Sequence, residues 1–442
     1  MATAQRREAS LIAAASRGTL DQVGRLTRGD TMKDTYLMQL ALGLTPPWSV
    51  TSSDFNAEAR RLDIHIDFAP GSRFPCPQCG AADCPTHDTD SMTWRHLNFF
   101  QHQAYLRARV PRIRCAACGV KKIGVPWARK DSSFTLLFEA LVMTLMTSMP
   151  VLTAARMIGE HDGKLWRVLH HYIDEARARL DTSDVTAVAI DETAARRGHD
   201  YISLFVDIDQ AKVIFATEGK GAATVTAFAK DLTAHGGDPA AVEEVCIDMS
   251  PAFIKGVAES LPNAAVTFDR FHAVKIINDA VDQVRRAEQK GQAMLKGTRY
   301  IWLRNPDTLS AHQRAMLESL PTQHLKTARA YQIRLAFQAL YGQDGPEAGA
   351  AFLQKWYFWA THSRLPPMIE AARTIKRHWD GILRWFHSAI ANGLIEGINS
   401  LVQAAKAKAR GYRSSRNLIA IVYLITGKLD LRLPEWTRSY PR

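Results

Sequence analysis

Two Cys-x-x-Cys pairs constrain the first part of this chain more than any other feature. Cys76-Pro-Gln-Cys79 and Cys115-Ala-Ala-Cys118 are each followed by a glycine, which permits a tight turn after the second thiol. Each pair can offer two thiolates to one ion, and four thiolates complete the tetrahedral site of a structural Zn²⁺. The two pairs lie farther apart than in a compact zinc ribbon, so we expect a β-rich excursion between them.

Other readings of these cysteines are weaker. Ordinary buried thiols or a redox pair would not require two similar knuckles, and no secretion signal points to disulfides. Cys84-Pro-Thr-His87 offers a rival or additional pair of ligands. The same two residues can equally be a loop cysteine and a solvated histidine, and the sequence leaves this open.

Basic side chains surround the cysteine pairs, where they can neutralise phosphates or simply form a solvated face. The net charge of +12 suits a polyanion such as double-stranded DNA, although charge alone does not establish that partner. The basic residues of this region are Arg107, Arg109, Arg112, Arg114, Lys121, Lys122, Arg129 and Lys130.

The whole chain reads as globular. Its hydrophobic fraction is 46%, and none of its apolar runs reaches the about 18 residues that span a bilayer, so we expect no membrane partner. Residues 1–31 lack the apolar centre of a secretion signal and read as an arm or an upstream extension. We therefore expect a cytoplasmic protein, and with DNA as its partner, one at the bacterial nucleoid.

A helix-turn-helix is predicted before the middle of the chain. Val151–Ile158 and 164–171 have helical spacing, and the glycines at 159 and 163 mark the turn between them. The second helix would present Lys164, Arg167 and either His170 or His171 to the major groove. Two helices that merely pack together would show the same pattern.

From residue 184 the pattern changes to short β-branched runs and helices. Three strands, a helix, a strand, a helix and a strand follow one another up to Phe268, which is the order of a ribonuclease-H-like core. After Arg270 the strand signals stop, and the chain reads as one helix after another.

Two aspartates follow apolar strands of this core. Asp191 comes after the run 185–190 and Asp248 after the run 242–247, so adjacent strands can bring them together. Glu396 lies on a late helix within Asn392-Gly-Leu-Ile-Glu-Gly-Ile-Asn399. Three hard oxygen ligands of this kind can hold two Mg²⁺ (or Mn²⁺) ions.

Each acid also has a structural reading. Glu192 adjoins Asp191 and could be the ligand in its place. Asp248 stands at a good capping position for a helix that begins at Pro251. Spacing alone does not connect Glu396 to either aspartate.

At this point the chain resembles the ISL-three family of bacterial insertion-sequence transposases, from about Met32 to about Lys428. The matching stretches appear in the order of the family and are long enough to be specific. They are Cys76-Pro-Gln-Cys79-Gly, Trp94-Arg-His-Leu97, Val110-Pro-Arg-Ile-Arg-Cys115, Val125-Pro-Trp-Ala128, Ala189-Ile-Asp-Glu-Thr193, Cys246-Ile-Asp-Met-Ser250, Phe268-Asp-Arg-Phe-His272 and 392–399.

The resemblance implies a DDE transposase with Asp191, Asp248 and Glu396 as its triad. It also implies that Asp269 and His272 lie near the metals, or that His272 only caps the first helix of the insertion. The basic helix that follows the glutamate in the family is interspersed with alanine here, and we expect its Lys406 and Arg410 to contact DNA.

The expected fold class is therefore multidomain α+β, with a ribonuclease-H-like α/β core interrupted by an all-α insertion. The expected activity is binding of terminal inverted repeats, followed by two-metal-ion strand cleavage and strand transfer into target DNA by a homodimer on DNA. A catalytically inactive DNA-binding regulator and a ribonuclease-H-like nuclease are the alternatives. The expected divisions are an arm at 1–31, a zinc-binding β-rich domain at 32–130, a helix-turn-helix at 131–182, the first part of the core at 183–271, the insertion at 272–388, and the glutamate helix with a basic tail at 389–442.

Overall fold

The computed structural model describes residues 34–196, 200–388 and 393–434. The chain forms two compact units, Met1–Val142 with Leu433–Arg442, and Met143–Arg432. The expected arm at 1–31 lies outside the described residues, as does the end of the expected basic tail. In the part of the chain that is described, none of the helices is long and apolar enough to cross a membrane.

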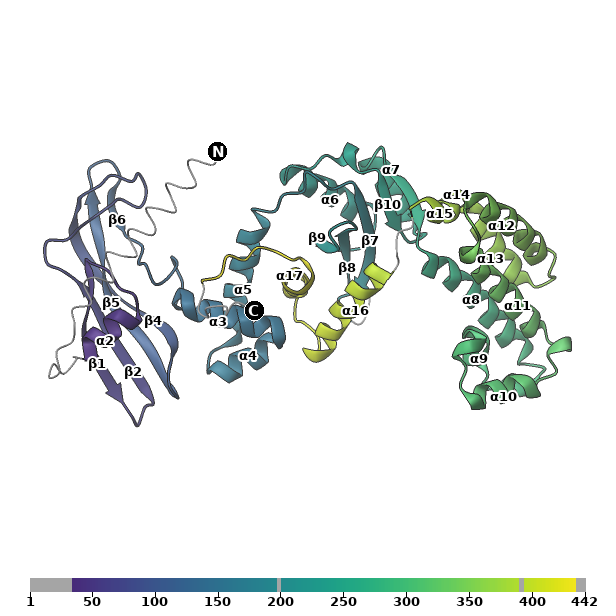
Figure 1. The fold of residues 1–442 in the computed structure, drawn as a ribbon, viewed down its shortest axis with the longest axis horizontal. Coiled ribbons are helices and arrows are strands. Elements are labelled where there is room, and N and C mark those ends of the chain that lie inside the picture. The colour runs from purple at the N-terminus through teal and green to yellow at the C-terminus, as the bar shows by residue number, and fades with distance from the viewer. Residues whose placement is uncertain (1–33, 197–199, 389–392, 435–442) are drawn as a thin grey trace. The chain divides into compact units, whose positions relative to one another are not determined.

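The first unit is built on a six-stranded sheet (Figure 1). Alternating side chains of β2 bury Leu62, Ile64 and Ile66, which pack with Trp94 and Leu106 of the central hairpin. That hairpin, β4 and β5, is the predicted β-rich excursion between the two cysteine pairs. The sheet order is β1 (Trp48–Asn56), β2 (Arg61–Phe68), β5 (His102–Cys115), β4 (Cys84–Phe99) and β3 (Arg73–Phe74), with β6 (Gly119–Lys122) paired to β5 and α2 (Asp34–Ala41) against β1.

Three helices follow, α3 (Leu136–Ser148), α4 (Val151–Ile158) and α5 (Asp162–Arg177). The first predicted helix of the helix-turn-helix has the bounds of α4, whereas α5 is longer at both ends than the predicted 164–171. Gly159 ends α4 in the left-handed region at φ 72°, and its N–H bonds back to the helix. Glycine is suited to this position because it carries no Cβ.

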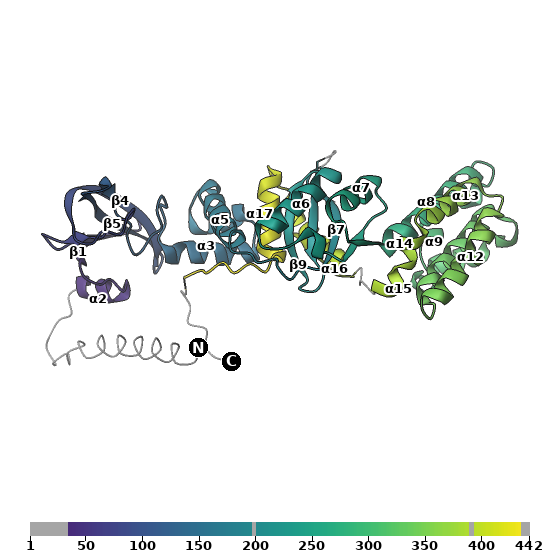
Figure 2. The same cartoon turned by 90° about the horizontal axis from the view of Figure 1, so that it is seen from above.

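The second sheet has the order β11-β10-β7-β8-β9. Figure 2 labels two of its strands, β7 and β9, together with the helices α6 and α7. Strands β7, β8 and β9 are antiparallel neighbours, whereas β10 and β11 run parallel to β7. Helices α6 and α7 pack their apolar side chains into the core of this sheet, and α17 lies against β9. The bounds are β7 (Ala187–Ala194), β8 (Tyr201–Asp207), β9 (Lys212–Glu218), α6 (Ala222–Ala234), β10 (Glu244–Ile247), α7 (Pro251–Ser260), β11 (Ala265–Phe268) and α17 (Ser415–Thr426).

One strand boundary differs from the sequence prediction. Strand β7 does not end before Asp191 but continues to Ala194, because its pairing with β8 extends to Ala194 and Tyr201. Asp191 therefore lies within a paired strand, where its backbone is held more rigidly than in a loop.

Between β11 and the late helix α16 the chain is helical, as predicted. Trp302 and Trp356 are buried in this segment, and Nε1 of Trp356 donates to the carbonyl of Ile333. The last helices return to the sheet, where a Cβ on Gly381 would lie only 2.5 Å from the ring of Phe268. The helices are α8 (Arg270–Glu288), α9 (Arg299–Leu303), α10 (Ala311–Ser319), α11 (Lys326–Gln338), α12 (Pro346–Thr361), α13 (Pro366–Arg377), α14 (Trp379–Leu383), α15 (Trp385–Ser388) and α16 (Gly393–Lys408).

Candidate functional site

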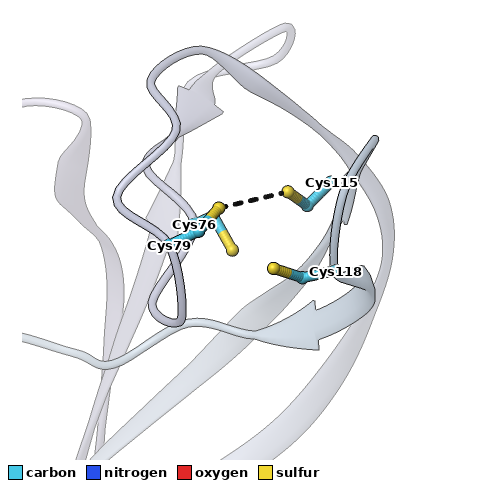
Figure 3. A group of neighbouring side chains, drawn as sticks. All are labelled: Cys76, Cys79, Cys115 and Cys118. Carbon is cyan, nitrogen blue, oxygen red and sulfur yellow. Dashed lines mark hydrogen bonds between the residues drawn. The ribbon is translucent and has the colours of Figure 1, made fainter.

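The four predicted cysteine ligands come together in the first unit. Cys76 and Cys79 lie in the turn after β3, Cys115 ends β5, and Cys118 lies in the turn before β6. Their sulfur atoms are all within 4.8 Å of one another, and the Sγ atoms of Cys79 and Cys115 are 3.6 Å apart (Figure 3). Backbone N–H groups of the second knuckle lower the pKa of Cys115 to about 6, which favours the thiolate form that binds zinc. The cluster therefore fits a closed structural zinc site.

Cys84 and His87 do not belong to this ligand set. Cys84 is buried nearby, but burial and the neighbouring cysteine sulfurs raise the pKa of its thiol. Its Sγ donates a hydrogen bond to the carbonyl of Ala81. His87 instead places Nδ1 3.2 Å from the carboxylate of Asp88.

Acidic neighbours offset much of the positive charge on β5. Arg107 pairs with Asp63 at 2.7 Å, and Arg109 pairs with Asp67 at 3.0 Å. Arg112 forms a two-point contact with Asp88. Arg114 is exposed, as are Arg107 and Arg109. The sheet is consequently less positive than its arginine content suggested.

Helix α5 presents only part of the predicted recognition set to solvent. Arg167 is exposed, and Lys164 pairs with Glu160 at 2.8 Å. His170 is turned toward α17, where its Nε2 lies 3.0 Å from Oδ1 of Asn417. His171 is half-buried, and its ring packs against Tyr172.

Asp191 and Asp248 lie at the same edge of the second sheet. The parallel pairing of Cys246 with Ala189 places Asp248, two residues farther on, beside Asp191. Oδ1 of Asp191 accepts from the N–H of Glu192 at 2.8 Å, and burial raises the pKa of this carboxyl. Oδ1 of Asp248 accepts from the N–H of Ser250 at 2.9 Å, while Ser250 itself occupies the N-cap of α7.

Asp269 adds a third carboxylate at the end of β11. Its Oδ1 accepts from the N–H of Phe271 and so caps α8, and its Oδ2 lies 2.9 Å from Nδ1 of His272. The hydrogen bond to Asp269 raises the pKa of His272, and the charges of Asp191 and Asp248 act in the same direction. His272 is therefore a partner of this acidic edge rather than the cap of the insertion helix.

Glu192 is a neighbour of the same edge. Successive side chains of a strand point to opposite faces, so Glu192 and Asp191 diverge. Burial raises the pKa of Glu192, and the charge of Asp248 adds to this effect while Lys220 opposes it.

Helix α16 is fastened along β7 by three side chains. Nδ2 of Asn399 donates to Oδ2 of Asp191 at 2.5 Å. One turn after Asn399, Nε2 of Gln403 donates to Oγ1 of Thr193. A further turn on, Nζ of Lys406 donates to the carbonyl of Ala194. Sequence reasoning missed Asn399 and Gln403, although their spacing from Lys406 is that of one helix face.

Glu396 lies one turn before Asn399 on the same helix and is exposed. Within the described residues, the cysteine cluster is the only group of three or more potential ligands whose atoms lie within 4.8 Å of one another. Asp191, Asp248 and Glu396 do not form such a group. Oδ1 of Asn399 is buried there with no hydrogen-bond partner. This amide oxygen beside the carboxylate of Asp191 is the type of ligand that hard divalent cations prefer.

Three family models match successive parts of the chain. Residues 188–422 match a family model described as a transposase. Residues 125–173 match the helix-turn-helix domain of transposase family ISL3, and residues 72–118 match the zinc-finger of transposase IS204/IS1001/IS1096/IS1165.

Two curated relatives resemble most of the chain. The transposase for insertion sequence element IS1557 of Mycobacterium tuberculosis is 27% identical over 385 residues, which cover 79% of this chain and 85% of the relative. The transposase for insertion sequence element IS1001 of Bordetella parapertussis is 27% identical over 354 residues, or 76% and 85% of the two chains. Since the transposase model alone spans more than half of the sequence, this chain belongs to the ISL3 family of insertion-sequence transposases.

Proposed function

We propose that this transposase cleaves and joins DNA with Asp191, Asp248 and Glu396 as its catalytic carboxylates. The observation that carries the proposal is the link between Asp191 and Asn399, because it joins the strand of the first acid to the helix of the third. Asp248 stands beside Asp191 in the parallel register of β10 and β7. Within the family this is the chemistry of a DDE enzyme.

The core around these acids is proposed to be ribonuclease-H-like. Three antiparallel strands, β7 to β9, are followed in the chain by α6, β10, α7 and β11. Both β10 and β11 lie on one side of β7 and run parallel to it, and this arrangement supports the assignment. Helices α8 to α15 would then be an insertion between the second aspartate and the glutamate. The proposed domains are those expected above, with 32–130, 131–182, 183–271, 272–388 and 389–442 as zinc domain, helix-turn-helix, core, insertion and core end.

The three carboxylates would hold two Mg²⁺ or Mn²⁺ ions. When bound, such ions activate the attacking oxygen and stabilise the leaving oxygen of an in-line phosphoryl displacement. The chain itself orients the ligands: Asn399 and the N–H of Glu192 each hold one oxygen of Asp191. Oδ2 of Asp269 lies 2.9 Å from Nδ1 of His272 and so fixes the orientation of the imidazole ring.

Double-stranded DNA would be bound as terminal inverted repeats and as target. Arg167 and Lys164 of α5 are the proposed duplex contacts of the helix-turn-helix. Lys406 and Arg410 are proposed to contact the DNA strand near the catalytic edge. The arginines of β5 would contribute phosphate contacts that depend on salt, namely Arg107, Arg109, Arg112 and Arg114. Two ends must be joined together, so we propose a homodimer on DNA, at the nucleoid in the cytoplasm.

Single substitutions test the catalytic assignment. Asp248→Asn and Glu396→Gln each keep the shape of the side chain and remove one charge, so cleavage of the ends should be lost while binding to them remains. The end sequences for this assay would be taken from the inverted repeats expected on either side of the open reading frame. Full cleavage by Glu396→Gln would refute the triad, and normal cleavage by both variants would favour a different catalytic site. A catalytically inactive regulator would show no Mg²⁺-dependent cleavage in the unsubstituted protein.

A further inference from the structure

A basic groove of about 810 Å³ lies beside the end of β7 and the C-terminal part of α16. Its cationic lining side chains are Arg196, Lys406, Arg410 and Arg413, and its lining residues include no acid among those described. Gln403 and Tyr412 also line the groove. A concave surface with cations of one sign attracts an anion with several charges.

The groove is assembled by the tertiary structure from three separate places. Arg196 follows β7, Lys406 belongs to α16, and Arg413 precedes α17. Helix α16 ends at Lys408, and the positive φ angles of Arg410 and Gly411 turn the chain back toward β7. The cations are therefore brought to one concave surface rather than spread along a basic helix.

The groove adjoins the acidic edge through the contacts of α16. Gln403 both lines the groove and bonds to Thr193, two residues after Asp191 on β7. Ala195, another lining residue, is four residues after Asp191, or about 13 Å along a strand at about 3.3 Å per residue. At this separation the groove can hold a strand's backbone a few nucleotides away from a phosphate that lies at Asp191.

We propose that this groove binds the backbone of a single DNA strand a few nucleotides from the phosphodiester that is cleaved. The proposal rests on the proposed function, because it takes Asp191 as part of the cleavage site. Four cations beside the ring of Tyr412 form the kind of surface that follows the backbone of a single strand. A single strand fits its charge, since one phosphate accompanies every nucleotide.

Tyr412 adds a surface for bases. Its ring is half-buried, with the ring of Trp166 edge-on at 6.2 Å. Aromatic rings beside a basic groove stack on bases with little preference for sequence. We therefore expect the groove to select single-stranded DNA by shape and charge rather than by sequence.

Binding of a fluorescein-labelled oligothymidylate to the full chain tests the proposal. The double variant Arg196→Gln and Arg413→Gln should bind at least about tenfold more weakly at moderate salt. The slope of log affinity against log salt should fall by about 1.4, because each single-strand phosphate contact contributes about 0.7. A matched control removes two exposed charges elsewhere, in Arg286→Gln and Lys290→Gln.

The outcomes are distinct. Equal weakening by both double variants, or an unchanged salt slope, would overturn the groove in favour of a general charge effect. Equal weakening for oligothymidylate and for duplex would identify a duplex-binding surface instead. Asp248→Asn separates this result from the proposed function, since it should abolish cleavage and leave oligothymidylate binding and its salt slope unchanged.

A second experiment tests which phosphate of the strand the groove binds. Neutral methylphosphonates placed one at a time in an end substrate should slow cleavage by the unsubstituted protein most at one phosphate a few nucleotides from the cut. The groove double variant should lose that sensitivity. A sensitivity that persists in the double variant would place this phosphate elsewhere on the protein.

Discussion

Nδ2 of Asn399 donates a hydrogen bond of 2.5 Å to Oδ2 of Asp191, across 208 positions of sequence. Oδ1 of the same carboxylate is held by the N–H of Glu192. Both oxygens of Asp191 are thus oriented by the chain, and one of the two donors sits on the helix of Glu396. A change at Asn399 should therefore affect the first and third proposed acids together.

Asn399→Leu should slow cleavage by about 10- to 100-fold, the usual cost of losing a group that orients a metal ligand. Single-turnover cleavage and the Mn²⁺ concentration for half-maximal rate measure this effect, and end binding should not change. Ser400→Ala is the control, because Ser400 is exposed on the same helix. An unaltered rate and metal requirement in Asn399→Leu would show that the bond does not matter for catalysis.

Asp191→Asn should abolish strand cleavage, whereas Glu192→Gln should keep most of it. Asp191 is the acid tied to α16, and Glu192 is the neighbouring acid most easily mistaken for it. Cleavage of labelled ends in Mg²⁺ compares the two variants directly. The opposite pattern would move the first ligand by one residue.

Purified protein should contain one zinc ion per chain, and Cys115→Ser should lose it together with much of the stability of the first unit. Elemental analysis and thermal unfolding measure the two effects. Cys84→Ser is the matched control, because its thiol lies outside the four-sulfur cluster. Loss of zinc in Cys84→Ser at the level of Cys115→Ser would show that the ligand set is wrong.

The stability of the first unit should fall as pH decreases from about 6.5 to about 4. Burial lowers the pKa of His96 from 6.5 to about 4, so the folded state binds this proton less readily than the unfolded chain. The stability that neutral His96 contributes to the first unit is fully present above pH 6.5. About 2 kcal/mol of the free energy of unfolding should be lost by pH 5. Denaturant unfolding across this range should show a shallower pH dependence for His96→Gln than for the exposed-site control His324→Gln. Identical slopes in both variants would contradict a buried neutral His96.

Arg167→Ala should weaken binding to the ends by about 1–3 kcal/mol if its guanidinium reads a base, with little effect on random duplex. Lys164→Ala should cost less, because Lys164 already pairs with Glu160. Competition between end sequence and random duplex measures both. Equal loss on the two DNAs would make Arg167 a phosphate contact.

Much of the fold followed from local patterns. The glycine turn at 159 marked the end of a helix, and short apolar β-branched runs located the strands of the second sheet to within a few residues. Such runs are visible in the sequence because central strands of this sheet are buried along almost their whole length. The limit appeared at β7, where pairing with a distant strand carried the strand past Asp191.

The sequence by itself indicated the two Cys-x-x-Cys pairs, the helix-turn-helix and the order of strands along the chain, because each pattern is read from residues close together in the sequence. Tertiary structure alone decided that Asn399 meets Asp191, that His170 turns toward Asn417, and that aspartates neutralise three arginines of β5. It also gathered Arg196 and Arg413 into one groove. Contacts of this kind depend on how whole elements pack, and packing is set by the summed burial of many side chains rather than by any local spacing.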